Sequence, residues 1–210
     1  MTLSPNEDLL IAGLKTVSDW EKFRDTLKGN VPENWETAFN DFFFVRLDSR
    51  YFQPIKAIRE NGNLSGEGFS IVAIQCALIE FLESTIQGKI YRYRRQGEVS
   101  GDHEYSRSEE IFIEFLCSRP PFRQTFNRTV AKEFYQSDRC GLLHEARTKN
   151  GWKIRADGPN DSIIDETGRI LYRNNFQKAI ERFLEWYRQQ LISTTAIQEA
   201  FIRKFNSLCD

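Results

Sequence analysis

Arg139 and His144 are the two side chains of this sequence best suited to chemistry on a phosphate ester. A histidine titrates near neutrality, with a free pKa of about 6.5, and so can take up or give a proton. An arginine stays charged and presents a planar fork of donors that matches phosphate oxygens. Together they suit attack by an RNA 2′-hydroxyl on the adjacent phosphate, which needs no metal ion and cannot use DNA. These residue types therefore indicate a metal-independent ribonuclease site.

The helix expected to position this pair runs from Asn127 to about Thr148. A separation of five residues along a helix corresponds to about 7.5 Å of rise. It also places the two side chains about 140° apart around the axis, so that they flank a groove. Gly141, which lies between them, is expected to let another helix approach closely.

The run from Arg139 to His144 (RCGLLH), together with the flanking Phe134 and Trp152, resembles the HEPN superfamily. These proteins are helical bundles, and their ribonuclease members carry an Arg-x4–6-His motif on a late helix. The resemblance covers about residues 67–191, although its sharp part is only the motif. It implies a homodimer whose two motifs meet across a cleft, RNA as the substrate, and a role as a toxin or defence effector. An antitoxin or another regulatory protein is then an expected partner.

Two carboxylates are candidates for supporting roles. Glu80 lies in the middle of the most apolar predicted helix, where an unpaired carboxylate is unfavourable. It is expected to pair with Arg139 or to orient His144, with another arginine or a position at the helix edge as the alternatives. Glu145, adjacent to His144, is a further candidate, and its alternative is an exposed helix position. Asp138 carries the least indication of a role.

A basic and aromatic segment is the candidate RNA-binding surface. Interleaved rings and guanidinium groups can stack bases and hold backbone phosphates. The candidates in this segment are Tyr91, Arg92, Tyr93, Arg94 and Arg95, and a solvated surface segment is the alternative interpretation. Four basic residues beyond the motif could extend this surface along the flap: Arg147, Lys149, Lys153 and Arg155.

Cys140 favours a second hypothesis of a different class. Active HEPN members often carry Asn, Asp or His directly after the arginine, and this chain has a cysteine there. The alternative function is a non-catalytic HEPN-like module that binds a partner protein, a nucleotide or RNA.

Composition narrows the remaining function classes. The net charge is −1, so a nucleic-acid site must be a local patch. The 4 cysteines lack metal-ligand spacing and there are 2 histidines, so no metal or cofactor is expected. The N-terminus does not read as a signal peptide, and the apolar stretch Phe69–Leu82 is too short and too polar to span a bilayer. A cytoplasmic protein with no membrane contact is therefore predicted.

The predicted fold is mainly α, an HEPN-like helical bundle with a small β-hairpin or three-stranded flap after the motif helix. One domain is expected over residues 1–210, with N-terminal helices in 1–60 and the core bundle in 67–191. Pro5 is expected to open the first helix, and Ser18 to begin a capping box for the second. Residues 89–107 are predicted to form an exposed excursion. The flap covers about residues 152–172, and a last helix covers 195–208.

Overall fold

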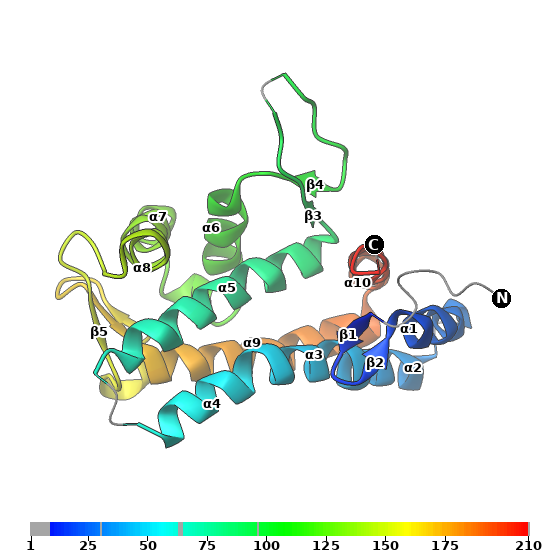
Figure 1. The fold of residues 1–210 in the computed structure, drawn as a ribbon, viewed down its shortest axis with the longest axis horizontal. Coiled ribbons are helices and arrows are strands. Elements are labelled where there is room, and N and C mark those ends of the chain that lie inside the picture. Colours follow the sequence, from blue (N-terminus) through cyan, green and yellow to red (C-terminus); the bar gives the residue numbers. More distant parts are fainter. Residues whose placement is uncertain (1–8, 30, 63–64, 96, 210) are drawn as a thin grey trace. The chain divides into compact units, whose positions relative to one another are not determined.

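The computed structural model describes residues 9–29, 31–62, 65–95 and 97–209 (Figure 1). Helices hold 66% of the residues and strands 9%, which confirms the mainly α prediction. Within the single domain that the sequence predicts, contacts divide the chain into two compact units. The terminal unit comprises Met1–Pro54, Ser84–Ser106 and Tyr187–Asp210, and the central unit comprises Ile55–Glu83 and Arg107–Trp186. Each unit contains a cluster of packed aromatic rings.

The terminal unit is built mainly from helices, with two short strand pairs. Its elements are β1 (Leu10–Ala12), β2 (Lys15–Thr16), α1 (Val17–Arg24), the 3₁₀ segment η1 (Asp25–Gly29), α2 (Pro32–Thr37), the π-helical η2 (Ala38–Phe44), α3 (Val45–Leu47), the π-helical η3 (Asp48–Phe52), β3 (Ile90–Tyr91), β4 (Glu104–Tyr105) and α10 (Thr195–Asn206). Three helices contribute residues to both units: α4 (Gln53–Glu60), α5 (Glu67–Gln87) and α9 (Arg173–Ser193).

The antiparallel hairpin of β1 and β2 replaces the predicted first helix, and that prediction was wrong for the residues described. Gly13 adopts a φ of +57° in the two-residue turn, a conformation that glycine enters without strain. A Cβ on Gly13 would also lie 2.5 Å from a methyl carbon of Val45. Pro5, expected to open that helix, lies outside the described residues.

The capping box of α1 begins at Thr16, two residues before the predicted Ser18. The backbone N–H of Asp19 donates to Thr16 Oγ1 at 3.3 Å, and that of Thr16 donates to the Asp19 carboxylate at 2.8 Å. The sequence prediction therefore found the helix but misplaced its start.

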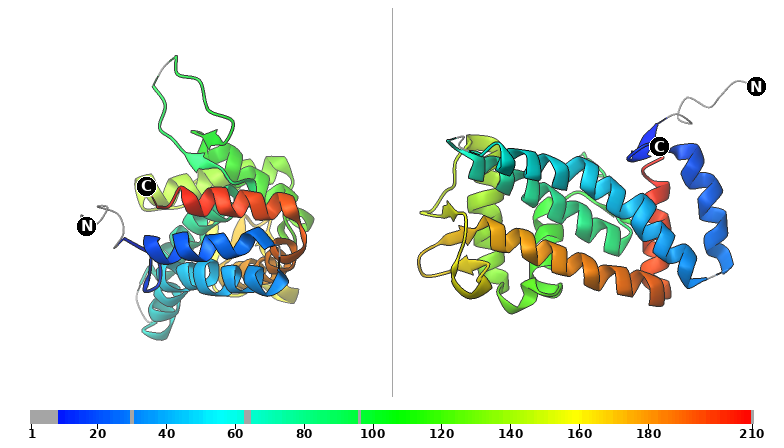
Figure 2. Two further views of the ribbon diagram at one scale, coloured as in Figure 1. Left: turned by 90° about the vertical axis from the view of Figure 1, so that its right-hand side faces the viewer. Right: turned by 90° about the horizontal axis from the view of Figure 1, so that it is seen from below.

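Trp20 is at the centre of the aromatic cluster of the terminal unit. Its ring lies 5.3 Å from that of Phe42 and 5.1 Å from that of Phe205, between ring centroids. Its Nε1 donates to Asn206 Oδ1 at 3.0 Å, so the polar end of the buried indole is also paired. These contacts hold α1 beside α10, as Figure 2 shows.

The described residues between α5 and α6 (Ser108–Ser118), 89–95 and 97–107, are exposed or partly exposed, as predicted (Figure 1). Only its ends pair, as the short parallel strands β3 and β4, with Ile90 opposite Glu104 and Tyr91 opposite Tyr105. Val99, in the intervening loop, is 90% exposed.

The central unit contains the predicted motif helix and flap. Its remaining elements are α6 (Ser108–Ser118), the 3₁₀ segments η4 (Phe122–Gln124) and η6 (Pro159–Asp161), α7 (Arg128–Phe134), the π-helical η5 (Tyr135–Arg139), α8 (Cys140–Glu145), β5 (Lys153–Arg155), β6 (Ile164–Asp165) and β7 (Ile170–Tyr172). The three strands form a sheet in the order β5-β7-β6, with β5 parallel and β6 antiparallel to β7. The β segment is therefore a three-stranded sheet, one of the two forms that the sequence predicts.

Helix α5 supplies the polar bonds that join several elements of the central unit. Gln75 Nε2 donates to Arg173 O at 3.0 Å and to Gln177 Oε1 at 3.1 Å, which links α5 to α9. By length and hydropathy α5 could also cross a membrane, but 61% of its most apolar window is buried. Core helices of soluble proteins meet the same criterion.

Candidate functional site

The predicted motif helix is continuous from Arg128 to Glu145 and contains one π-helical turn. Asn127 caps its start, because its side chain accepts from the backbone N–H of Val130 at 3.0 Å. The wide turn, η5, ends at Arg139. Single π-helical turns inside α-helices often occur at functional sites, because they change the direction of one side chain.

Gly141 is required by the loop that follows the helix. A Cβ at this position would lie 2.4 Å from the carbonyl oxygen of Arg147. The helix ends at Ala146, which adopts a left-handed conformation, and the backbone N–H of Arg147 then donates to Gly141 O at 3.3 Å. The segment that approaches Gly141 is thus the chain's own loop, and not the other helix that the sequence led us to expect.

Arg139 pairs with Glu80, which was one of the alternatives predicted for this carboxylate. Arg139 Nη2 donates to Glu80 Oε2 at 3.3 Å, and each side chain is 18% exposed. The other oxygen, Glu80 Oε1, accepts from Ser108 Oγ at 2.7 Å. The helices α5 and α6 therefore hold the guanidinium group in place, and a small part of the Arg139 side chain stays exposed to solvent.

Tyr135 gives Arg139 a second contact. The guanidinium carbon lies 5.3 Å from the centre of the Tyr135 ring, within the range of a cation–π interaction. Burial raises the pKa of the Tyr135 hydroxyl to about 12, so the ring stays neutral at physiological pH. Tyr135 and Arg139 are one turn apart, and the ring limits where the guanidinium can move.

His144 is exposed and lies in the last turn of α8. Its imidazole forms no hydrogen bond or ion pair with any residue that the structure describes. The adjacent Leu143 is 50% exposed. The imidazole is therefore available to a ligand, whereas Arg139 is partly engaged within the chain.

The burial of Asp138 was not predicted from the sequence. This residue is fully buried, and neither carboxylate oxygen has a hydrogen-bond partner among the described residues. Burial raises its pKa to about 8, so the group is protonated at neutral pH. The spacing of Phe134, Asp138 and Leu142 places all three on one helix face, which is the pattern that could have revealed this burial.

Glu145 forms ion pairs with two of the basic residues expected beyond the motif, Arg147 and Lys149. Its Oε2 accepts from Arg147 Nη2 at 2.9 Å, and its Oε1 lies 2.5 Å from Lys149 Nζ. All three residues are at least partly exposed. The structure thus brings Glu145, Arg147 and Lys149 together next to His144 in sequence.

The basic and aromatic run of residues 91–95 belongs to the terminal unit. Arg92 pairs with Glu104 at 2.8 Å, and Arg94 donates to Ser106 Oγ. Tyr93 is 77% exposed, and Tyr91 is 52% exposed with its ring against that of Tyr105. The Arg95 guanidinium is exposed and forms no ion pair within the described part of the chain.

Two cavities are described in the central unit, and neither is lined by Arg139 or His144. One, of about 270 Å³, lies at the start of α5, and the other, of about 370 Å³, lies on α7. Within residues 9–29, 31–62, 65–95 and 97–209, no group of three or more His, Cys, Asp or Glu side chains is placed to hold a metal ion.

Comparison with known proteins found no matching family model, no matching curated protein and no matching solved structure. The resemblance of the segment from Arg139 to His144 to the HEPN superfamily, with the activity, dimer and partners that it implies, stays a prediction.

Proposed function

We propose that the protein is a metal-independent endoribonuclease in which His144 transfers protons and Arg139 stabilises charge on the phosphate. The observation that carries this proposal is the contrast within one helical segment. An exposed imidazole without a partner among the described residues lies five residues after an arginine that is held by Glu80 and whose side chain is 18% exposed. Those are the properties required of a general base and of an electrostatic stabiliser.

The reaction proposed is attack within the RNA strand. His144 accepts the proton of a ribose 2′-hydroxyl as the 2′-oxygen forms a bond to phosphorus. The bond from phosphorus to the 5′-oxygen then breaks, and that oxygen takes a proton from the protonated His144. The products are a 2′,3′-cyclic phosphate and a 5′-hydroxyl. Arg139 donates to the non-bridging oxygens, whose negative charge increases in the transition state.

Glu80, Ser108 and Tyr135 act as positioning residues in this proposal. Glu80 binds one Nη atom of Arg139, and Ser108 binds the other oxygen of that carboxylate. Tyr135 lies against the guanidinium group. An arginine fixed before the substrate arrives loses less side-chain entropy when it binds a phosphate.

RNA binding in this proposal uses the exposed rings and guanidinium groups of residues 91–95. Tyr93 and Arg95 are the most available, because Arg92 and Arg94 already have partners within the chain. Arg147 and Lys149 would contact the strand next to the motif in exchange for their pairs with Glu145. A homodimer and a toxin or defence role, with a regulatory partner protein, complete the proposal on the basis of the resemblance alone.

The test is cleavage of labelled RNA in excess EDTA by the wild type and single variants. His144→Ala should slow cleavage by about 10²-fold or more, since general acid–base catalysis contributes that much. His103→Ala is the matched control, because His103 is the other histidine and is also exposed. Loss of activity in His144→Ala only, with 2′,3′-cyclic ends from the wild type, supports the proposal. Equal activity of the two variants refutes it.

A second candidate function is a non-catalytic module that binds phosphate or RNA. It is favoured by the ion pair of Arg139 with Glu80, which already offsets the charge needed for catalysis, and by Cys140 beside it. In that case pure protein binds RNA but leaves it intact. Binding would then weaken in Arg139→Ala and stay unchanged in His144→Ala, whereas the ribonuclease proposal requires both side chains.

A further inference from the structure

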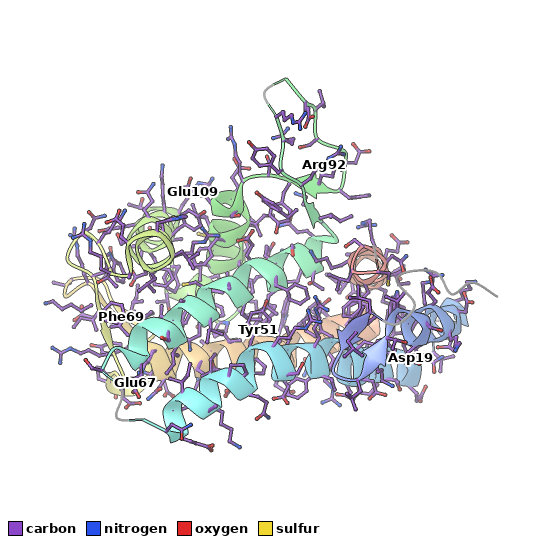
Figure 3. The ribbon with its side chains drawn as sticks, in the orientation of Figure 1. Asp19, Tyr51, Glu67, Phe69, Arg92 and Glu109 are labelled. Atoms are coloured by element: carbon purple, nitrogen blue, oxygen red, sulfur yellow. The ribbon has the colours of Figure 1, made fainter. Side chains whose placement is uncertain are left out.

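The cavity at the start of α5 shares no residue with the proposed ribonuclease site. It has a volume of about 270 Å³ and is lined by the first turn of α5, strand β5 and the first residue of α9. Figure 3 labels Glu67 and Phe69 at this end of α5. All of its lining residues belong to the central unit.

Two arginines give this cavity donors for an anion. Arg155 is exposed and has no hydrogen bond or ion pair with the residues that the structure describes. Arg173 is 12% exposed, and its Nη2 donates to Glu67 Oε1. The Nε of Arg173 is buried and lacks an acceptor within the described part of the chain. Its Nη1 also forms no hydrogen bond or ion pair with the described residues, so this nitrogen is the donor that remains for a ligand.

Gly68 lies against the cavity wall that Ile154 and Arg173 form. A Cβ there would lie 3.2 Å from Ile154 Cγ2 and 3.4 Å from Arg173 Nη1. A side chain at this position would therefore push against Arg173, one of the two arginines that line the cavity.

Two other lining residues have the chemistry to bind a nucleoside. Phe69 is 41% exposed, which is unusual for a phenylalanine and leaves part of its ring open to a planar group. A base stacks on such a ring whatever its identity, because every base has a π-face. The Glu67 carboxylate is 22% exposed and can accept hydrogen bonds from ribose hydroxyls.

We propose that this cavity binds a nucleoside monophosphate. The phosphate binds Arg155 and Nη1 of Arg173, the base stacks on Phe69, and a ribose hydroxyl donates to Glu67. The volume suits one nucleotide rather than a folded RNA. The same chemistry is offered by a free nucleotide and by the 5′-phosphorylated end of a strand, and the experiment separates these two sources.

The test is calorimetric titration of the full-length protein with adenosine 5′-monophosphate. Adenosine and inorganic phosphate are the matched partial ligands, and each should bind at least about tenfold more weakly than the nucleotide, because each lacks half of the contacts. A 5′-phosphorylated dinucleotide that binds as tightly as the nucleotide identifies a strand end as the ligand. Weaker binding of the dinucleotide identifies the free nucleotide.

Arg155→Ala should weaken nucleotide binding about tenfold or more, since it removes a charge-assisted contact. Phe69→Ala should weaken the nucleotide and leave inorganic phosphate unchanged. The matched control is Lys153→Ala, an exposed basic residue of the same strand that does not line the cavity. Arg155 and Phe69 are both exposed, so their substitution should leave the protein folded, and unfolding curves check this.

Three results would overturn the proposal. They are no heat of binding at nucleotide concentrations up to about 1 mM, equal weakening by Lys153→Ala and Arg155→Ala, and phosphate binding as tight as that of the nucleotide. The proposal does not depend on Arg139 or His144. Failure of RNA cleavage therefore leaves it standing, and its own failure leaves the ribonuclease proposal standing.

Discussion

Two glutamates of α5, Glu80 and Glu83, are about one helical turn apart, and each pairs with an arginine in a different geometry. Arg119 binds Glu83 through two bonds, from Nε to Oε2 at 2.9 Å and from Nη2 to Oε1 at 2.8 Å. Arg139 binds Glu80 through one bond of 3.3 Å. Glu83 is fully buried, whereas Glu80 is 18% exposed.

The difference separates a structural pair from a pair that can also bind a ligand. Two donors of Arg119 bind the two carboxylate oxygens of Glu83. Because the carboxylate is buried, loss of this pair lowers the free energy of unfolding strongly. The single bond of Arg139 leaves further N–H groups of the guanidinium for a phosphate. Two glutamates of the same helix, each paired with an arginine, therefore have different roles. The pair of Glu83 stabilises the central unit, and the pair of Glu80 leaves its arginine able to serve chemistry.

The largest expected effect is on folding, from Arg119→Ala. Removal of the arginine breaks a bidentate ion pair of the buried Glu83 carboxylate, and breaking such a pair lowers the free energy of unfolding by about 3–5 kcal/mol. Urea denaturation measures this change. The control is Arg123→Ala, since Arg123 is an exposed arginine of the segment that follows α6. Equal stability of the two variants would remove the contrast between the pairs.

Arg139→Ala should have the opposite balance, with a large loss of activity and a small loss of stability. RNA cleavage should fall about 10²-fold, because one preformed electrostatic contact to the transition state is lost. The free energy of unfolding should fall by only about 1–2 kcal/mol, because Glu80 is partly exposed and keeps its bond from Ser108. A loss of stability as large as that of Arg119→Ala would mean that both pairs are structural.

Asp138 sharpens the comparison, because it precedes Arg139 directly yet is buried without a partner. Its pKa rises from 3.8 to about 8 on folding, so the folded protein holds a proton that the unfolded chain releases between these values. Stability should therefore fall with rising pH across this window, by up to about 1.4 kcal/mol per pH unit.

Asp138→Asn should remove that slope. The gain in unfolding free energy of the variant over the wild type should be absent near pH 4 and should grow toward pH 8. Thermal melts of both proteins at several pH values measure it. Parallel stability curves across this range would show that the carboxyl is not held protonated.

The smallest effect is expected from Glu80→Gln, which keeps the shape of the side chain and removes its charge. Because Glu80 acts only through Arg139, cleavage should slow by about tenfold or less. The loss should appear in kcat rather than KM if the carboxylate aligns the guanidinium for the transition state. Glu80→Asp should restore part of the rate, and a stability change without any kinetic change would argue against a positioning role.

The sequence predicted the elements whose apolar residues repeat at helical spacing. From the unfavourable burial of a lone carboxylate it also indicated the pairing of Glu80 with Arg139 as one of several alternatives. It did not predict the hairpin at Gly13, because a two-residue turn outweighed the helical propensity of its neighbours. The setting of Asp138 was also missed, since charged residues are normally assigned to the surface. Exposed partners such as Glu145 with Arg147 depend on a loop path that no periodicity encodes.

The left-handed Ala146 has a consequence for protein engineering. Its φ of +53° is unfavourable for any residue with a Cβ, by about 1 kcal/mol, and glycine would adopt it freely. The chain therefore stores a small amount of conformational energy two residues after His144, where a glycine would normally end a helix. Ala146→Gly offers a more heat-resistant protein whose candidate catalytic groups are untouched, a convenient background in which to introduce every destabilising variant above.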